Sequence, residues 1–487
     1  MSYLALDVGA SSGKLFCGSF DGARLSIETV HRFENRAIPL RDGLYWDFLG
    51  IWQNLCVGLQ KASLGGSIKS IGVDSYCNDF SFIDKDGDLL LPIRSYRDER
   101  TIRCADAIYA TMNPAELYRE TGNQIAPFNT LMQLAAMRAE GKDALLDSAH
   151  RLLYMPDLIA FYMTGETLAE ESICSVSQMY SFESGGWSDK ILEAYNIPKR
   201  LFGTLTAPGT ISGRTTRQFE SHWGVESFDF VSVCEHDTAS AFLAASGGGN
   251  QAILSSGTWA IVGCESAAPV ISDYGFKYNI ANEGSLSGHH RLLRNVMGSW
   301  LLQELIRDYA RDGIELSFAE LISFAESAKP FAFLIDVDDA VFFSPGETRQ
   351  KIREKCIAED GKTPETTGEF ARCICESLTL KYRWAIERLE TLTGRKFNEI
   401  SVIGGGTQDG LSCQMTADAT GRPVAAGPVE ASAIGNILTQ LLAHGEIGSI
   451  AQGRELVKKS FPQTHYEPKS SAIWNEAYDR YTAALGL

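Results

Sequence analysis

Asp7 stands where a short apolar strand ends and a turn of small residues begins. It follows Leu4-Ala-Leu6 and precedes the small residues of the turn and Lys14. A carboxylate at such a strand end can hold a hydrated magnesium ion beside phosphate groups, while turn hydroxyls, amide N–H groups and a lysine can bind a terminal phosphate. Aspartate also caps ordinary turns, and Lys14 suits a solvated surface charge, so both interpretations stay open from these residues alone.

Asp237 lies in a similar place, after the apolar run Val231-Ser-Val-Cys and before the small residues of a helix start. A carboxylate there can accept the proton of an attacking hydroxyl, and Thr238 could cap the helix that follows. The alternative is that Asp237 itself is the N-cap. His236 is expected to be a hydrogen-bonded buried histidine with a substrate contact at most.

A third element, Ile400-Ser-Val-Ile-Gly-Gly-Gly406, is an apolar strand that ends in three glycines before a helical pattern. Such a turn lets a phosphate or an adenosine group come close to the backbone, and its free N–H groups can donate hydrogen bonds to that group. The chain contains neither the dinucleotide G-x-G-x-x-G nor the Walker G-x-x-x-x-G-K-[ST] pattern. A Rossmann dehydrogenase or a P-loop enzyme is therefore disfavoured.

The elements that must position these residues alternate between strands and helices. The first 35 residues predict three strands joined by tight turns, 48–62 has helical spacing, and 68–75 has the short apolar run of a buried strand. From 100 to 150 the pattern is largely helical, with Asn113 before Pro114 as an N-cap candidate. This pattern predicts an α/β protein.

The strand, turn and strand of the N-terminus recur at 252–263, directly after a glycine-rich stretch. Both copies place Ser and Gly in a tight turn between apolar strands, as expected if two similar domains face one nucleotide. A hinge is predicted near 245–250. Small polar turns between strands are common, so coincidence is the alternative for this pair taken by itself.

Bulk composition excludes several classes of function. The 487 residues suit two domains; 44% are hydrophobic and 22% charged, with no apolar stretch long enough for a membrane span. A formal net charge of −17 without long basic runs argues against nucleic acid. The N-terminus lacks a leader-like pattern, which predicts a cytoplasmic protein. The eleven scattered cysteines are expected to be mostly free thiols, Cys373 and Cys375 buried in a helix, with no zinc site.

Taken together, these segments resemble the FGGY carbohydrate kinases over nearly the whole chain. The matching blocks are Leu6–Lys14, Tyr96–Thr101, Pro127–Thr130, His236–Ala241, Leu254–Trp259, Asn295–Gln303, Gly404–Gly406 and Ala426–Ser432. The resemblance implies an actin-like ATPase (ribonuclease H-like) fold with two domains around a nucleotide and sugar cleft, and domain closure on sugar binding. It implies an N-terminal domain of 1–246, mainly sugar-binding, and a C-terminal domain of 247–487, mainly ATP-binding, whose last helices could pack back on the first.

The same resemblance assigns roles by position. It implies ATP and Mg²⁺ as cofactors and Asp237 as the general base, with Asp7 and Asp237 on the metal side. The implied ATP contacts are Ala10, Ser11, Ser12, Gly13, Lys14, Thr258, Asn295, Gln303 and Gly405. The implied sugar contacts are Cys77, Asp79, Asp98, Arg100, His236, Asp237 and Thr238.

Two positions depart from the pattern of the subfamily that the chain resembles most, which acts on L-rhamnulose. Cys77 stands where a glycine faces the sugar, and Lys14 replaces an arginine, which keeps the charge but loses a two-pronged phosphate grip. Because one extra methylene alters selection by about 1 to 3 kcal/mol, L-fuculose, ribulose or xylulose are alternative substrates. A non-kinase actin-like ATPase or a sugar-binding regulator is the remaining alternative. Composition does not decide the oligomeric state.

Overall fold

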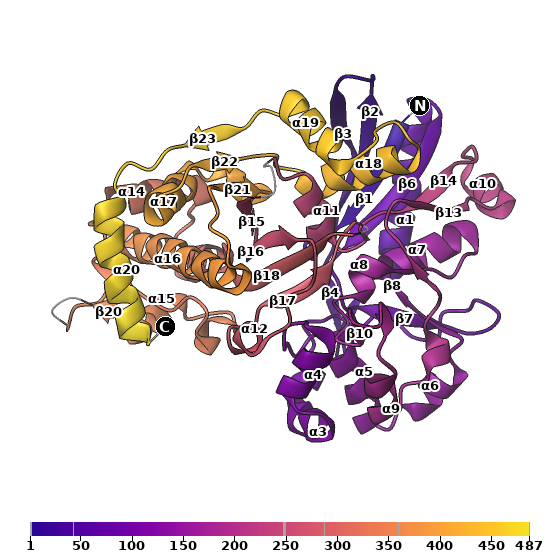
Figure 1. The fold of residues 1–487 in the computed structure, drawn as a ribbon, viewed down its shortest axis with the longest axis horizontal. Coiled ribbons are helices and arrows are strands. Elements are labelled where there is room, and N and C mark those ends of the chain that lie inside the picture. The colour runs from indigo at the N-terminus through magenta and orange to yellow at the C-terminus, as the bar shows by residue number, and fades with distance from the viewer. Residues whose placement is uncertain (1, 42, 247–249, 287, 359–360, 487) are drawn as a thin grey trace. The chain divides into compact units, whose positions relative to one another are not determined.

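The chain forms two compact units. In a computed structural model, residues 2–41, 43–246, 250–286, 288–358 and 361–486 are described (Figure 1). The first unit comprises 1–244, 265–292 and 430–460; the second comprises 245–264, 293–429 and 461–487. Among the described residues, no helix has the length and apolar character needed to cross a bilayer. The predicted hinge near 245–250 lies partly outside the described residues, because 247–249 are among those left out.

The first unit is built on a six-stranded sheet in the order β13-β14-β6-β1-β2-β3, in which β13 spans Thr210–Arg214. The predicted N-terminal meander is confirmed as β1 (Ser2–Val8), β2 (Ser12–Phe20) and β3 (Leu25–Glu34), each antiparallel to the next. β6 (Ile68–Ser75) runs parallel to β1 and β14 (Asp229–Ser232) parallel to β6. Asp7 is therefore in register with Lys14 on one side and Asp74 on the other.

Helices cover both faces of this sheet. The predicted helix at 48–62 is confirmed as α1 (Phe48–Leu64), which packs with α7 (Met155–Thr164) over one apolar face. The other face carries α18 (Ala431–Ala443), which also packs on α11 (Asp237–Leu243). A Cβ at Gly435 would lie 1.7 Å from the Ser240 carbonyl oxygen. Glycine there allows α18 to lie directly against the helix that starts at Asp237.

The first unit also contains the following elements, of which β13 belongs to the same sheet. The helical prediction for 100–150 is confirmed, and Asn113 caps its helix with a full capping box on Glu116. The bounds are β4 (Ala37–Leu40), β5 (Gly43–Trp46), β7 (Phe80–Ile83), α2 (Arg100–Arg103), α3 (Ala105–Thr111), α4 (Pro114–Thr121), α5 (Thr130–Ala139), α6 (Asp143–Ser148), β8 (Arg151–Tyr154), β9 (Ala169–Glu170), α8 (Glu171–Cys174), β10 (Tyr180–Ser181), β11 (Gly186–Trp187), α9 (Asp189–Ala194), η1 (Lys199–Leu201), β12 (Leu205–Thr206), β13 (Thr210–Arg214), α10 (Arg217–Trp223), α12 (Asp273–Lys277), β17 (Ala281–Gly284) and α19 (Ile450–Ser460).

The second unit repeats the central arrangement of the first. Its strands follow the order β18-β16-β15-β21-β22-β23, with β15 antiparallel to β16 and parallel to β21. In the first unit, β1 is antiparallel to β2 and parallel to β6. In the second unit, β15 is likewise antiparallel to β16 and parallel to β21. The strand–turn–strand repeat read from the sequence is thus a structural repeat.

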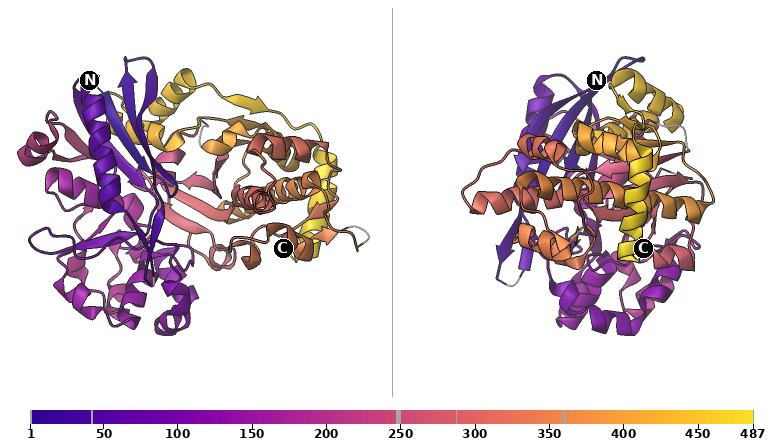
Figure 2. Two further views of the ribbon diagram at one scale, coloured as in Figure 1. Left: turned by 180° about the vertical axis from the view of Figure 1, so that it is seen from behind. Right: turned by 90° about the vertical axis from the view of Figure 1, so that its left-hand side faces the viewer.

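Helices α14, α16 and α17 pack together beside this sheet (Figures 1 and 2). Cys373 and Cys375 are buried in α16, as predicted, and no disulfide is formed among the described residues. The bounds are β15 (Gln251–Ser256), β16 (Trp259–Ser266), β18 (His290–Met297), α13 (Trp300–Arg311), α14 (Phe318–Ser327), β19 (Phe333–Leu334), η2 (Ala340–Phe342), α15 (Thr348–Lys355), β20 (Ile357–Ala358), α16 (Thr367–Thr393), β21 (Glu399–Ile403), η4 (Gly405–Gln408), α17 (Gly410–Thr420), β22 (Val424–Ala426), β23 (Thr464–Tyr466) and α20 (Ser471–Leu485).

Candidate active site

Three carboxyl groups gather in the first unit where β1, β6 and α11 meet. Asp7 Oδ2 accepts a hydrogen bond from Ser432 Oγ at 2.7 Å, and Asp74 Oδ2 accepts one from Asn436 Nδ2 at 2.6 Å. Burial and then the charge of Asp237 raise the pKa of Asp7 to about 7, and burial and then Asp7 raise the pKa of Asp74 well above its ordinary value. The structure therefore brings Asp7 and Asp237 together, with Asp74 as a third acid.

Lys14 is paired rather than solvated. Its Nζ lies 2.7 and 2.9 Å from the two carboxylate oxygens of Glu430, and its side chain is 24% exposed. This answers the alternative left open by the sequence, in which Lys14 was an ordinary surface charge. One lysine thus stands beside four acids, Asp7, Asp74, Asp237 and Glu430, which leaves the region with excess negative charge.

The turn between β1 and β2 presents the residues expected to contact ATP in this unit. Asn35 holds its base, since Asn35 Nδ2 donates to the Gly9 carbonyl at 2.8 Å and Asn35 N donates to the Ser11 carbonyl at 3.2 Å. Ser11 is exposed, and Ala10 and Ser12 are half-buried. The turn is therefore fixed by its backbone while its outer face is accessible.

Asp237 is the first residue of α11, and both sequence expectations for the helix cap are wrong. The N-cap position belongs to His236, whose side chain makes no capping bond. The reason is that strand pairing with β6 continues past β14: Ser75 N donates to the Glu235 carbonyl at 2.9 Å, and Ser75 forms a bridge with His236. The helix cannot begin before this extended run ends. Asp237 Oδ1 accepts from Thr238 Oγ at 3.0 Å, and its side chain stays 32% exposed.

His236 belongs to a buried charged cluster that the sequence did not reveal. Its Nδ1 lies 3.3 Å from Glu283 Oε2, and Arg291 Nη2 lies 2.9 Å from that same oxygen. Its Nε2 lies 3.5 Å from Asp237 Oδ1, and the Cys77 thiol is within hydrogen-bonding reach of the ring. Burial alone would lower the pKa of His236, but Cys77 and Glu283 raise it to about 10.

The other predicted sugar contacts form a second, more enclosed group. Asp79 accepts from Trp46 Nε1 at 2.7 Å and from Gln133 Nε2 at 2.9 Å, and burial raises its pKa to about 7. Arg100 Nη2 donates to Gln133 Oε1 at 3.0 Å, and burial, followed by Arg94, lowers the pKa of Arg100 to about 10. These side chains hold one another through Gln133.

Asp98 directs both carboxylate oxygens at donors of the protein. Its Oδ1 accepts from Arg100 N at 2.9 Å, and its Oδ2 accepts from Leu44 N at 2.9 Å and lies 3.1 Å from Arg94 Nε. Although burial acts in the opposite direction, these hydrogen bonds bring the pKa of Asp98 below its ordinary value. Asp98 thereby ties β5 to the start of α2.

The expected ATP contacts of the second unit lie around one turn. The β15–β16 turn carries Thr258, whose carbonyl accepts from Trp300 N at 3.2 Å, while the Gly257 carbonyl accepts from Ser299 Oγ at 3.0 Å. Gln303 Nε2 donates to the same Ser299 Oγ at 3.0 Å. Asn295 lies on β18, the neighbour of β16 in the sheet. Hydrogen bonds thus join the turn to the start of α13, and β18 lies next to β16 in the same sheet.

The glycine turn after β21 closes on the same strand pair. Gly404 has φ +83°, which favours glycine, and its N donates to the Pro428 carbonyl at 3.0 Å. A Cβ at Gly406 would lie 2.2 Å from Ser256 Oγ, whereas a Cβ at Gly405 would meet nothing within 4 Å. The third glycine is therefore needed for packing, and the second faces open space.

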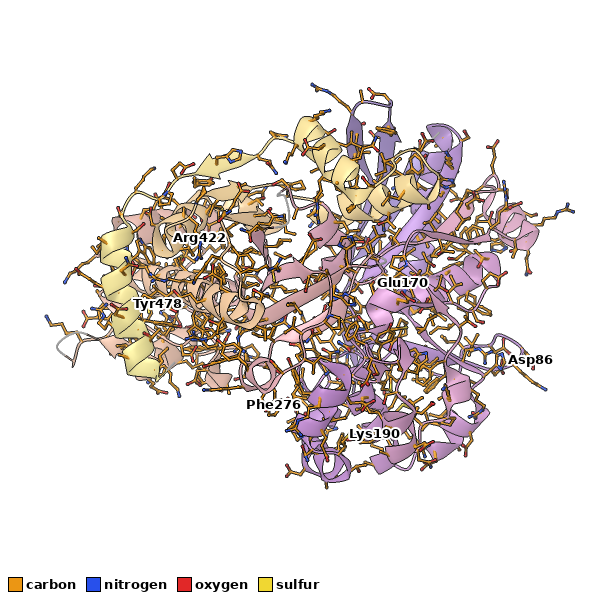
Figure 3. The ribbon with its side chains drawn as sticks, viewed as in Figure 1. Asp86, Glu170, Lys190, Phe276, Arg422 and Tyr478 are labelled. Atoms are coloured by element: carbon orange, nitrogen blue, oxygen red, sulfur yellow. The ribbon has the colours of Figure 1, made fainter. Side chains whose placement is uncertain are left out.

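A second set of buried carboxyls lies in the first unit and takes no part in the predicted site. Asp157 on α7, Glu170 on β9 (labelled in Figure 3) and Glu235 are all at most 1% exposed. Glu170 accepts hydrogen bonds from Ser172 N at 2.8 Å and Glu235 N at 3.2 Å. Burial, followed by the charge of Glu170, raises the pKa of Asp157 to about 7, and burial raises the pKa of Glu170 to about 7.

Sequence reasoning missed Glu430, Asp74, Glu283 and Arg291. Glu430 lay in the matching block Ala426–Ser432, and Asp74 lies at the end of the predicted strand 68–75, three residues before Cys77, so both could have been singled out. Glu283 and Arg291 stand in ordinary strand patterns with no motif around them. Only their contacts with His236 reveal them.

Two family models match the chain. Residues 2–244 match the N-terminal domain, and residues 252–444 the C-terminal domain, of the FGGY family of carbohydrate kinases. The fold agrees with solved structures: a xylulose kinase from Lactobacillus acidophilus aligns with a TM-score of 0.85 at 15% identity, covering 100% of this chain and 98% of that one. A glycerol kinase from Plasmodium falciparum, solved with ADP, aligns with a TM-score of 0.80 at 14% identity, covering 100% and 97%.

Sequence relatives cover almost the entire chain. A rhamnulokinase of Bacteroides thetaiotaomicron is 37% identical over 479 residues, which is 98% of each protein. A rhamnulokinase of Bacillus subtilis is 35% identical over 472 residues, 96% of each. The actin-like two-domain architecture expected from the sequence is thereby supported, and the chain belongs to the FGGY family of carbohydrate kinases.

Proposed function

We propose that this carbohydrate kinase transfers the γ-phosphoryl group of ATP to the 1-hydroxyl of a ketose, L-rhamnulose, giving L-rhamnulose 1-phosphate. The observation that carries the proposal is the accessible carboxylate of Asp237, set at a helix start beside Asp7 and His236 in a family of sugar kinases. The sugar is suggested by relatives of 33–37% identity that are rhamnulokinases.

In the proposed reaction, Asp237 is the general base. Its carboxylate accepts the proton of the sugar hydroxyl as that oxygen attacks the γ-phosphorus in line, and ADP leaves with the bridging oxygen. The carboxylate is suited to this because the Thr238 hydroxyl donates to its Oδ1 while 32% of the side chain stays exposed, and a base must be able to reach the proton. Thr238 and His236 then contact the sugar around that hydroxyl.

The residues around Asp7 fit a divalent cation. No group of three or more His, Cys, Asp and Glu side chains that could hold a metal is found in the described part of the chain, so an all-protein cage is absent there. Magnesium, however, keeps several waters and uses one or two carboxylates. Asp7 and Asp237 would hold it, because their carboxylates lie close enough for the charge of Asp237, after burial, to raise the pKa of Asp7. Bound there, Mg²⁺ would neutralise phosphate charge.

We assign the remaining contacts as the resemblance implies. Residues 1–246 would bind the sugar and supply the phosphate turn Ala10–Lys14, and 247–487 would bind most of the nucleotide through Thr258, Asn295, Gln303 and Gly405. Cys77 would lie against the sugar, while Asp79 and Arg100 would line the site from their Gln133 cluster. Asp98, whose oxygens already accept from the protein, would support Arg100. We place the enzyme in the cytoplasm.

A ketose panel tests this function. Magnesium-dependent ADP release should rise at least tenfold with L-rhamnulose and less with L-fuculose, ribulose and xylulose at equal concentrations. Should another ketose show a much higher kcat/KM, the substrate assignment is wrong, since Cys77 changes the volume at the sugar. ADP release that ignores every sugar would instead favour an actin-like ATPase or a sugar-binding regulator.

Gly405→Ala should weaken ATP binding without destabilising the protein. A Cβ at this position meets no atom of the protein within 4 Å, so any cost must come from the ligand. We expect the KM for ATP to rise about tenfold, equivalent to about 1.4 kcal/mol, with the KM for the sugar changed less than twofold. Steady-state kinetics and a thermal melt measure both.

Gly406→Ala is the matched comparison, one residue further along the same turn. Its Cβ would lie 2.2 Å from Ser256 Oγ, so this variant should lower the melting temperature. An unchanged KM for ATP in Gly405→Ala would show that Gly405 does not contact the nucleotide.

A further inference from the structure

Behind the proposed sugar site lies a charged pair that no step of the reaction uses. Arg291 has 0% and Glu283 2% of its side chain exposed, and the two are joined at 2.9 Å. A fully buried ion pair gives little net stability, because removing two charges from water costs about what their attraction returns. Both residues of the pair, however, also contact one neighbour, the ring of His236.

The pair occupies one side of the His236 ring. Glu283 Oε2 and Arg291 Nη2 each lie 3.3 Å from Nδ1. Nε2 is left on the opposite side, 3.5 Å from Asp237 Oδ1 and towards the proposed sugar site. Because the two nitrogens of an imidazole point in fixed, divergent directions, the partner of one determines where the other can form a hydrogen bond.

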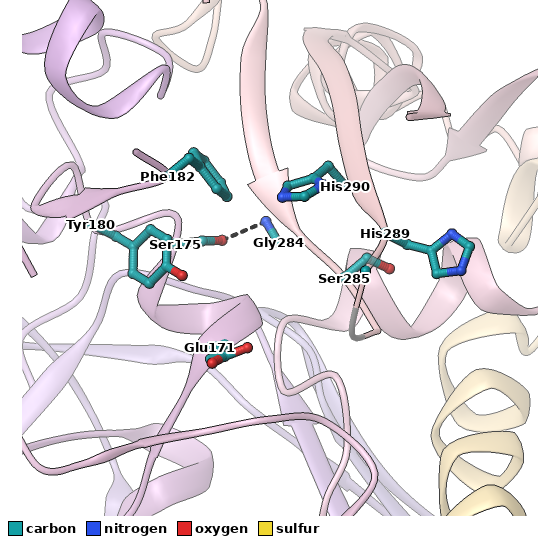
Figure 4. A pocket seen from close by; sticks show the side chains of 9 residues that line it. Glu171, Ser175, Tyr180, Phe182, Gly284, Ser285, His289 and His290 are labelled. Carbon is teal, nitrogen blue, oxygen red and sulfur yellow. Dashed lines mark hydrogen bonds between the residues drawn. The ribbon is translucent and has the colours of Figure 1, made fainter. Parts of the chain in front are cut away.

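The Arg291 side chain and the backbone next to Glu283 are themselves held in place. Arg291 Nε donates to the Gly284 carbonyl at 3.0 Å, and its guanidinium lies over the Phe242 ring, 5.6 Å from the centroid. Gly284 N in turn donates to Ser175 Oγ at 2.7 Å, which ties β17 to the segment after α8 (Figure 4). The buried pair therefore has a defined position beside His236, unlike an ion pair on the surface.

We propose that Glu283 and Arg291 are positioning residues that fix the His236 ring so that Nε2 meets a second oxygen of the sugar, next to the hydroxyl activated by Asp237. The inference rests on the proposed function and extends it. A ketose phosphorylated at its 1-hydroxyl carries an oxygen on the adjacent carbon, and a hydrogen bond there would orient the attacking hydroxyl towards Asp237. The Cys77 thiol is a further neighbour of this ring.

The inference predicts that disturbing the pair weakens binding of the sugar and leaves binding of ATP unchanged. Glu283→Gln keeps the shape but removes the charge that holds Nδ1, and it should raise the KM for the sugar about tenfold or more while the KM for ATP stays within twofold. Glu283→Asp should restore part of the loss. In a His236→Ala background, Glu283→Gln should have little further effect, because the ring it positions is gone.

A purely structural role would give a different pattern. It would lower the melting temperature, affect both substrates alike, and add its full effect in the His236→Ala background. Either that pattern or an unchanged KM for the sugar would overturn the inference. Glu171→Gln, a half-buried carboxylate on α8 that does not contact His236, is the control and should match the wild type. If Glu283→Gln does not fold, Arg291→Lys should give the same sugar-specific loss.

The two proposals can fail separately. If the wild-type chain releases no more ADP with any ketose, the proposed function fails, and the positioning role is tested by calorimetric binding of L-rhamnulose without ATP. There, Glu283→Gln should raise the Kd about tenfold. A wild-type enzyme stimulated by L-rhamnulose, together with an unaltered Glu283→Gln, would leave the function standing and refute the positioning role.

Discussion

Asp237→Asn should reduce sugar-dependent ADP release by about 10²- to 10⁴-fold, the range that general-base catalysis contributes. Asparagine keeps the size of the side chain and can still accept from the Thr238 hydroxyl, but it cannot take up the proton of the attacking oxygen. The loss should therefore appear in kcat, with the KM for the sugar changed only a few-fold. Initial rates of ADP formation with L-rhamnulose measure it.

Asp229→Asn provides the comparison for this variant. Asp229 lies at the start of β14, pairs with Arg214 at 3.6 Å, and belongs to no part of the proposed site. It should leave kcat unchanged. A kcat of Asp237→Asn within a few-fold of wild type would mean that another group accepts the proton.

Asp157→Asn should stabilise the protein at alkaline pH and not at acidic pH. In the folded protein, burial and the neighbouring Glu170 raise the pKa of Asp157 from 3.8 to about 7, so folding favours its protonated form. The contribution of this group to the free energy of unfolding is fully present below the unfolded pKa near 4, and it is lost as the pH rises through about 7. Above about pH 7, the buried and ionised carboxylate lowers the free energy of unfolding.

The size of the effect follows from the shift. About three pKa units correspond to a few kcal/mol at most, and the amide removes this penalty. At pH 8.5 the melting temperature of Asp157→Asn should exceed that of the wild type by roughly 5 to 10 °C, and below about pH 4 the two should differ little. Thermal melts across this pH range measure the difference.

Glu171→Gln changes a half-buried carboxylate on α8, directly after Glu170. It should leave the pH dependence of the melting temperature as in the wild type. Equal stability of Asp157→Asn and wild type at pH 8.5 would show that the ionised carboxyl is tolerated inside this unit.

Local sequence predicted much of the scaffold. Strands β1, β2, β3, β6, β15 and β21 and helix α1 lie where apolar spacing and turn residues place them, within a few residues. The strands are short apolar runs bounded by turn residues, and α1 has apolar residues at helical spacing, so the pattern of a dozen or so residues is sufficient. The Asn113 cap followed equally from its neighbours, because a capping box uses residues only three apart.

The start of α11 shows where this approach failed. Asp237 and Thr238 both have the chemistry of an N-cap, but the helix begins after His236 because the preceding backbone pairs with Ser75, far away in the sequence. Strand pairing between distant segments is invisible to local propensity. The same is true of Lys14, which is held by Glu430 across more than four hundred residues of chain.

By itself, then, the sequence determined the order of strands and turns, the repeated strand–turn–strand unit and the two aspartates, Asp7 and Asp237, that follow apolar runs, because these depend on neighbouring residues. Tertiary structure alone decided that Asp7, Asp74 and Asp237 share one region, that Lys14 is neutralised, and that Glu283 and Arg291 hold His236. Electrostatic and hydrogen-bond partners depend on distance in space, and the parallel pairing of β1 with β6 and the packing of α18 on α11 create those distances only when the chain folds.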